Sequence, residues 1–291
     1  MKRELGRPTV VKRILSTILL LVTFRAAADT SVRAPWLADA ASDLQPVHDT
    51  LEQRFSPPSG FTRVKLDKDS FGAFLRALPL APPGTPVKSF AGKTLHEATH
   101  PNIAAVVAID VGKSDLQQCA DSVIRMHAEW QWSLGKRDEH YKTAGGPEMS
   151  FAKYVSGDRY VWSEGKLALK KVPAITATHP AFRSWLDQVF GAANTGSLAK
   201  EAKPIDVKEL APGDFVVMPG VPFGHAVLVL DLARDSSGKR VALLGQGFMP
   251  AQSFQVLRRS PTEAWFPIDE ASGKLETPFW APFPFTLLRR L

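Results

Sequence analysis

Three apolar runs separated by turn residues occupy the C-terminal third of the chain and constrain its fold more than any other feature. They cover residues 214–218, 225–231 and 240–244, with a Pro-Gly turn before the first run and the sequence Asp-Ser-Ser-Gly between the last two. Short apolar runs bounded by Gly, Pro, Asp and Ser are typical of buried strands joined by hairpins. The sequence therefore predicts an antiparallel meander in this third.

The strongest helical pattern lies upstream, over residues 114–135. Ser114 and Gln117 fit a capping box, in which a serine hydroxyl accepts from a first-turn amide and the glutamine reaches back to the cap. One apolar stripe follows this start at helical spacing; its members are Leu116, Cys119, Ala120, Val123, His127, Trp130 and Leu134. We expect His127 and Trp130 to serve packing on this stripe.

The remaining periodicity completes a helix-rich first part. Apolar residues at helical intervals predict short helices within residues 43–55 and 69–78 and one through 182–190, while the β-branched run 103–112 predicts a buried strand. Helices that precede a sheet indicate an α+β fold. We predict a lead-in with a short helix over residues 29–60, followed by a single α+β domain over residues 61–291.

The first 28 residues predict a signal peptide. They carry six basic residues and one acidic residue, an apolar run over 14–24, and Ala26-Ala27-Ala28 at the end. A run of about 11 apolar residues is too short to span a bilayer, which needs about 20. We expect cleavage after residue 28, export to the periplasm or the medium, and no stable membrane span afterwards. An uncleaved anchor is the alternative.

The charge balance depends on this leader. The whole chain has 36 Lys and Arg residues against 29 Asp and Glu residues, but residues 29–291 hold 30 basic and 28 acidic residues. A strongly basic surface is the electrostatic mark of a nucleic-acid-binding protein. Because the predicted mature chain is nearly neutral, we expect no nucleic-acid partner.

Residues 96–100 read His-Glu-Ala-Thr-His and match the H-E-x-x-H pattern of zinc peptidases. In that pattern His96 and His100 would hold the metal from successive turns of a helix, with Glu97 as base. Gly92 lies just upstream, and Pro101 disfavours helical geometry at His100. We therefore expect neither a metal nor a cofactor, and keep a zinc peptidase as a distant alternative.

Cys119 is the only cysteine of the chain. It cannot form an internal disulfide, and an unpaired thiol in an exported protein is either buried or used. The predicted helix places it near an N-terminus, where unpaired amides and the helix dipole favour a thiolate. Cys119 is therefore a candidate nucleophile. The alternative is an inert core thiol on the apolar stripe.

His225 opens the second predicted strand of the meander and is the candidate base. A hairpin closed by Arg234 and Lys239 sets His225 opposite Phe248, with Gln246 diagonal on the same face. A side-chain amide at Gln246 could hold one ring nitrogen and orient the other toward sulfur. Asp231 is a weaker candidate for that role. His225 could instead be a hydrogen-bonded residue at a strand end, and Gln246 an ordinary polar residue.

A row of charges on the same helix receives a structural interpretation. Asp121, Arg125 and Glu129 follow one another at intervals of four residues. Such rows are typical of a solvated or structural helix face rather than of an acid–base pair.

Two resemblances add to these predictions. Residues 212–217 (Pro-Gly-Asp-Phe-Val-Val) and 224–229 (Gly-His-Ala-Val-Leu-Val), after a helix-borne Cys119, resemble the papain-like cell-wall cysteine peptidases of the NlpC type. Over residues 45–290 the chain resembles a bacterial exported family of unknown function. The stretches that match this family are residues 54–61, 115–121, 224–227 and 249–252.

These observations predict an exported cysteine hydrolase, a peptidase or amidase, with Cys119, His225 and Gln246 in its site. The NlpC resemblance implies a papain-like arrangement, with the helix-borne cysteine packed on an antiparallel sheet, and a peptide or glycan substrate of the cell wall. The alternative from a different class is a non-catalytic papain-like module that binds the envelope through the same cleft. The sequence does not determine the oligomeric state.

Overall fold

The computed structural model describes residues 34–39, 47–220 and 223–291. The predicted signal peptide, residues 1–28, lies outside this part of the chain. Helices and antiparallel strands both occur, so the fold is α+β, as predicted.

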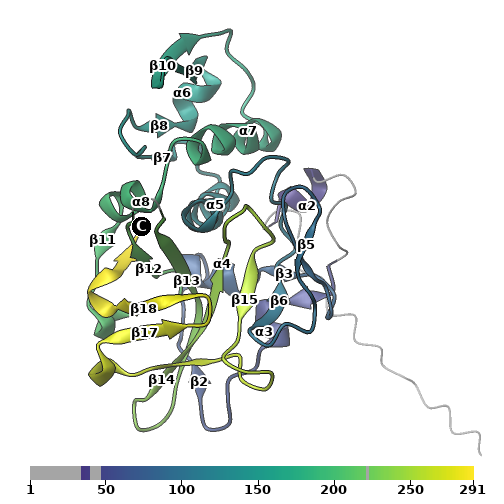
Figure 1. Ribbon diagram of the computed structural model, residues 1–291, viewed down its shortest axis with the longest axis vertical. Coiled ribbons are helices and arrows are strands. Elements are labelled where there is room, and N and C mark those ends of the chain that lie inside the picture. The colour runs from purple at the N-terminus through teal and green to yellow at the C-terminus, as the bar shows by residue number, and fades with distance from the viewer. Residues whose placement is uncertain (1–33, 40–46, 221–222) are drawn as a thin grey trace, which may run out of the picture.

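A central sheet of nine strands organises the molecule (Figure 1). Its pairings among the described residues are antiparallel, and the predicted meander β12-β13-β14 forms its middle. In spatial order the main path is β11 (Lys203–Pro204), β19 (Leu288–Arg290), β12 (Phe215–Met218), β13 (His225–Arg234), β14 (Arg240–Gln246), β15 (Gln255–Leu257) and β6 (Ile103–Val106). Two short strands add to it: β2 (Thr62–Arg63) pairs with β13, and β16 (Phe266–Ile268) pairs with β14.

Helix α5 (Cys119–Ser133) covers one face of the sheet. Its apolar residues Ala120, Val123 and Ile124 share a core with Ala226 and Leu228 of β13. The other helices are α2 (Trp36–Asp39), α3 (Leu51–Arg54), α4 (Phe71–Arg76), α6 (Phe151–Val155), α7 (His179–Phe190), α8 (Thr195–Glu201) and the 3-10 turns Val207–Glu209, Glu270–Ser272 and Phe285–Leu287. In the described part of the chain, every helix is too short or too polar to cross a bilayer.

A second core fills the opposite face of the sheet. Val227 and Val229 of β13 alternate with the residues that face α5, and they pack with Leu275 and Phe283 of the β17–β18 hairpin, drawn in yellow in Figure 1. The two-stranded sheets pair β1 (Asp49–Thr50) with β3 (Pro79–Leu80), β4 (Val87–Lys88) with β5 (Thr94–His96), β7 (His140–Tyr141) with β8 (Met149–Ser150), β9 (Asp158–Ser163) with β10 (Lys166–Lys171), and β17 (Lys274–Thr277) with β18 (Trp280–Pro284).

The N-terminal boundary of α5 differs from the prediction. The helix begins at Cys119, and its capping box is made by Gln118 and Asp121 rather than by Ser114 and Gln117. The Gln117 side chain instead donates to the carbonyl of Asp110 and accepts from Arg125. The Gln117 side chain, which the local pattern assigned to the helix cap, is thus engaged in tertiary hydrogen bonds. Two other predicted elements are shorter than expected: the described lead-in helix is α3, and the strand predicted over residues 103–112 ends at Val106.

The predicted register of the β13–β14 hairpin holds at the end that carries His225. Leu228 pairs with Gly245 and Val229 with Leu244, as the hairpin arithmetic requires. Beyond a bulge between Val229 and Asp231 the register shifts by one, so that Arg234 pairs with Arg240 rather than with Lys239. One extra residue in the turn is thus compensated by one extra residue in the strand.

Candidate active site

Cys119 is the first residue of α5, closer to the helix N-terminus than predicted. The preceding backbone amide, that of Gln118, donates to Asp121 Oδ2 at 3.1 Å and fixes the first turn. Free amides and the helix dipole favour a negative charge at this position. The local structure therefore offers amides to a thiolate or to an oxyanion formed beside it.

Gly247 lets this helix end approach the sheet, and Gly224 lets β12 and α8 lie close to the start of β13. A Cβ at Gly247 would overlap Ser122 Oγ and lie 2.9 Å from the carbonyl oxygen of Gln118, and a Cβ at Gly224 would overlap Met218 O. Only glycine leaves room for such close backbone contact. Gly224 directly precedes His225 in β13, and Gly247 directly follows Gln246 in β14. The start of α5 therefore lies where the ends of these two strands meet.

The thiol contacts the strand just before the histidine. Cys119 Sγ lies 3.8 Å from the carbonyl oxygen of Gly224, to which the thiol donates. Among the described residues no hydrogen bond joins Cys119 Sγ to the ring of His225. The structure thus brings the two residues to one place through the backbone, without a direct bond between the reactive atoms.

His225 is held by a hydrogen bond on one ring nitrogen. Its Nε2 donates to Gln246 Oε1 at 2.7 Å, in the pairing predicted from the hairpin register. The proton on Nε2 leaves the lone pair on Nδ1, and this buried Nδ1 has no hydrogen-bond partner among the described residues. Gln246 therefore fixes the tautomer in which Nδ1 can accept a proton.

Aromatic rings fix the plane of the histidine. The ring centroid of His225 lies 4.9 Å from those of both Phe248 and Trp280, and 6.1 Å from that of Phe283. The Phe248 contact follows from the predicted register. Trp280 and Phe283 come from β18, and no periodic pattern in the sequence linked them to His225. The imidazole is fully buried in this aromatic cage.

Burial sets the protonation states of both groups. Loss of solvent raises the pKa of the Cys119 thiol to about 11, and the neighbouring Asp121 carboxylate adds to that rise. Loss of solvent also lowers the pKa of His225 to about 4, against the opposing effect of the Gln246 hydrogen bond. At neutral pH the site therefore holds a neutral thiol and a neutral imidazole.

Asp121 is a titratable neighbour of Cys119 that the sequence pattern assigned to a structural charge row and not to the site. Burial raises the pKa of its carboxyl to about 8, and its Oδ1 has no hydrogen-bond partner among the described residues. The carboxyl is only two residues from Cys119 on the same helix. The carboxyl is therefore mostly protonated at neutral pH, and its negative charge acts on the thiol as the pH rises through about 8.

The rest of the predicted charge row is buried rather than solvated. Arg125 Nε donates to Glu129 at 2.8 Å, and its Nη2 donates to Asp110 at 2.8 Å, while His179 contacts Glu129 at 2.9 Å. Arg125 and Glu129 are both fully buried. Their partners lie far away in the sequence, so the four-residue spacing alone could not place the row inside the molecule. This network ties α5 to the segment that leads into it.

The two remaining candidates lie elsewhere. His96 ends strand β5 and His100 lies in the following turn, so the H-E-x-x-H segment is not helical, as Gly92 and Pro101 indicated. The two imidazole rings pack at 4.8 Å against each other. Asp231 is buried and accepts from Arg63 at 2.6 Å and from Arg76 at 2.7 Å, so it anchors β13 and does not orient His225.

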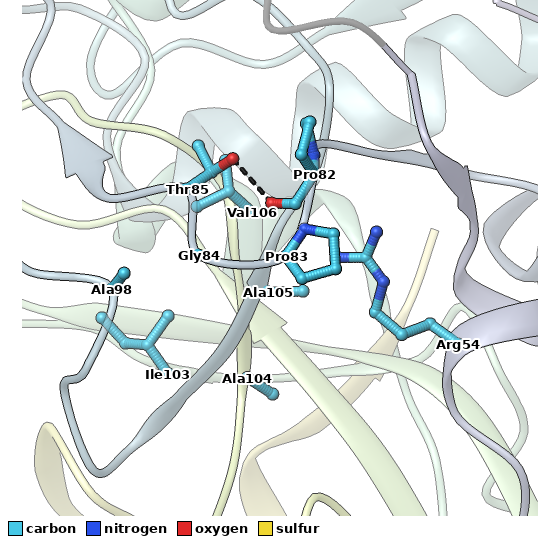
Figure 2. A pocket seen from close by; sticks show the side chains of 10 residues that line it. All are labelled: Arg54, Pro82, Pro83, Gly84, Thr85, Ala98, Ile103, Ala104, Ala105 and Val106. Atoms are coloured by element: carbon cyan, nitrogen blue, oxygen red, sulfur yellow. Dashed lines mark hydrogen bonds between the residues drawn. The ribbon is translucent and has the colours of Figure 1, made fainter.

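Two surface hollows are separate from the site, because neither is lined by Cys119, His225 or Gln246. The smaller hollow, of about 20 Å³, is shown in Figure 2, where Thr85 donates to the carbonyl of Pro82 across it. The larger, a groove of about 550 Å³, has Arg54, Trp265 and Arg258 among its lining residues. Cys119 as a whole residue is only 4% exposed. The candidate site is therefore closed to solvent in this structure.

One protein-family description fits almost the whole described chain. The family model for domain of unknown function 4846 matches residues 51–290. No curated protein and no solved structure matches the chain.

Proposed function

Since this chain belongs to that family of unknown function, we propose its activity from the site itself: a cysteine hydrolase of papain-like arrangement that cleaves an amide bond. Cys119 is the nucleophile, His225 the general base and Gln246 the group that orients the base. One observation carries the proposal. Cys119, the first residue of α5, contacts Gly224, which directly precedes His225. The Nε2 of that histidine is held by the Gln246 amide, and its buried Nδ1 has no hydrogen-bond partner among the described residues.

The protonation states define how such a site would work. Because thiol and imidazole are both neutral at neutral pH, the proton leaves sulfur during attack and not before it. Sγ bonds to the substrate carbonyl carbon while His225 Nδ1 takes the thiol proton. The carbonyl oxygen becomes an oxyanion, which backbone amides at the start of α5 stabilise.

The second half of the reaction returns the proton. The tetrahedral intermediate collapses to a thioester as the amine leaves with the proton from His225. Water then attacks the thioester, giving its proton to the imidazole, and the acid departs as the thiol is reprotonated. Gln246 keeps Nε2–H in place through both halves, so that the accepting nitrogen is always Nδ1.

The substrate class and location in this proposal come from the sequence. A leader typical of export and the likeness to cell-wall peptidases support an amide of an envelope peptide or glycopeptide, cleaved in the periplasm or outside the cell. A substrate of that kind must displace the groups that now cover the thiol.

A non-catalytic papain-like binding module is the second candidate, and the burial of the thiol favours it. A buried thiol with a pKa of about 11 is a poor nucleophile at neutral pH. Such a module would bind envelope peptide or glycan over the same strand ends, and Cys119→Ala would leave that binding unchanged.

An assay of turnover of labelled cell-wall peptides distinguishes the hydrolase from the binding module. It compares the wild-type chain with Cys119→Ala, His225→Ala and the exposed control His140→Ala. The hydrolase requires release of an amine by the wild type and by His140→Ala, with loss of at least about 100-fold in each of the two site variants. Binding without turnover in all four proteins would reject the hydrolase in favour of the binding module.

A further inference from the structure

The β9–β10 hairpin projects from the end of the molecule opposite to β2 and the start of β14, at the top of Figure 1. Its strands pair from Asp158–Lys171 to Ser163–Lys166, and they are joined by Glu164 and Gly165, both with positive φ. Two central residues of this kind make the turn whose twist matches that of the strands. The hairpin is therefore a defined projection rather than an irregular loop.

Exposed apolar side chains gather on this projection and on the segment that directly follows it. Trp162 is 61% exposed, Leu169 50%, Ile175 42% and Val161 41%. They are four of the seven large hydrophobic residues that are exposed in the described part of the chain. Single exposed apolar residues are common on protein surfaces, but a cluster of them marks a contact surface.

The cross-strand register extends this surface to the core. Trp162 faces Leu167 and Leu169 faces Tyr160 on the same side of the hairpin. Leu167 and Tyr160 are partly buried against the main core, whereas Trp162 and Leu169 are not covered. Each cross-strand pair on this face thus has one partly buried member, Leu167 or Tyr160, and one exposed member, Trp162 or Leu169, so the apolar face is anchored to the core and still open to solvent.

The same segment carries the net positive charge of residues 29–291. Residues 151–175 contain five basic and two acidic residues, while the rest of residues 29–291 contains 25 basic and 26 acidic residues. Lys171 pairs with Asp158, but Lys166 and Lys170 are exposed and have no ion-pair partner among the described residues. In the hairpin register these two lysines lie on the face opposite to Trp162, so the thin hairpin presents exposed apolar groups on one face and unpaired ammonium groups on the other, with Glu164 as the one acid at the tip.

We propose that the β9–β10 hairpin docks this protein on the surface of an anionic phospholipid bilayer. Tryptophan partitions to the headgroup level of membranes, and lysines next to an anionic leaflet are attracted to it. Neither signal alone gives firm attachment, but apolar insertion and basic charge together do. Docking through this end is independent of the proposed hydrolase activity, because no residue of the candidate site belongs to the hairpin.

Cosedimentation with vesicles tests the proposal. The full chain is mixed with vesicles of phosphatidylglycerol and phosphatidylethanolamine, and separately with phosphatidylcholine vesicles. The wild type binds the anionic vesicles more tightly. The double variant Lys166→Gln/Lys170→Gln weakens that binding about 25-fold, at about fivefold for each lysine, and Trp162→Ala weakens it on the order of tenfold. Residues 1–28 are identical in all proteins, so the differences report the hairpin.

Matched controls lie on other surfaces. Lys208→Gln/Lys239→Gln removes two exposed lysines elsewhere, and Leu134→Ala removes an exposed apolar residue; both should bind like the wild type. Brominated lipid should quench the fluorescence of the wild type more than that of Trp162→Phe. Equal binding by hairpin and control variants would overturn the proposal. So would hairpin variants that bind vesicles normally but lose a protein partner, since that result assigns the surface to protein recognition.

Discussion

Alkylation of Cys119 by iodoacetamide should be slow at neutral pH and should accelerate up to about pH 11. The reagent attacks the thiolate, whose fraction is set by the pKa. With the pKa of Cys119 at about 11, the thiolate fraction at pH 8 is about 0.1%, against about 24% for a free cysteine with a pKa of about 8.5. The labelling rate at pH 8 should therefore be about 200-fold below that of a free cysteine, before any effect of burial.

Mass spectrometry of the intact protein measures this rate without ambiguity, because the chain has one cysteine. Between pH 8 and pH 10 the rate should rise about tenfold per pH unit. In Asp121→Asn the carboxylate that raises the pKa of Cys119 is gone, so labelling at pH 9 should be faster than in the wild type. A labelling rate that levels off at or below pH 8 would refute the reasoning, since it requires a thiolate that burial does not disfavour.

Three further predictions concern the packing around the site. Gly247→Ala should destabilise the protein by about 1 to 3 kcal/mol in chemical denaturation, because a Cβ there overlaps Ser122 Oγ. Its control, Gly145→Ala, has open space around it and should stay within about 0.5 kcal/mol of the wild type. Equal stabilities of the two variants would contradict the close approach of α5 to Gly247. Arg125→Met should cost about 3 to 5 kcal/mol, since it removes the buried cation between Glu129 and Asp110 and leaves Glu129 with His179 and Asp110 with Arg183. Arg259→Met, which breaks an exposed pair, should cost under about 1 kcal/mol, and a similarly small loss for Arg125→Met would show that the buried network does not stabilise the fold. Burial lowers the pKa of His225 from 6.5 to about 4, so the unfolded chain binds the proton more readily than the folded chain. The neutral imidazole therefore contributes at most about 3 kcal/mol to the free energy of unfolding above pH 6.5, and this contribution is lost as the pH falls toward 4. His225→Gln should show a smaller loss over that interval in thermal denaturation, and an unchanged pH dependence would indicate a solvated imidazole.

The sequence predicted local features of the sheet well. Apolar runs and turn residues located β12, β13 and β14, and counting back from the turn placed Gln246 and Phe248 beside His225, where they lie. The bulge at residues 229–231 did not disturb this prediction, because it lies on the turn side of the pairs that matter.

Features that depend on distant segments could not be read from the sequence. Two overlapping capping boxes fit the start of α5, and the choice between them rests on Asp110 and Arg125, which take the Gln117 side chain. The burial of Arg125 likewise depends on His179 and Asp110 closing the network. The aromatic cage of His225 needs Trp280, which reaches it only after the β17–β18 hairpin folds over the sheet.

The order of strands in the central sheet has a consequence for how the chain folds. β6, from residues 103–106, pairs with β15, and Asp231 is bound by two arginines that come more than 150 residues earlier. Few of these contacts are local, and such high contact order makes folding slow. The early strands β2 and β6 therefore cannot complete their pairing until the C-terminal strands have formed, and their apolar residues stay exposed to aggregation during that interval.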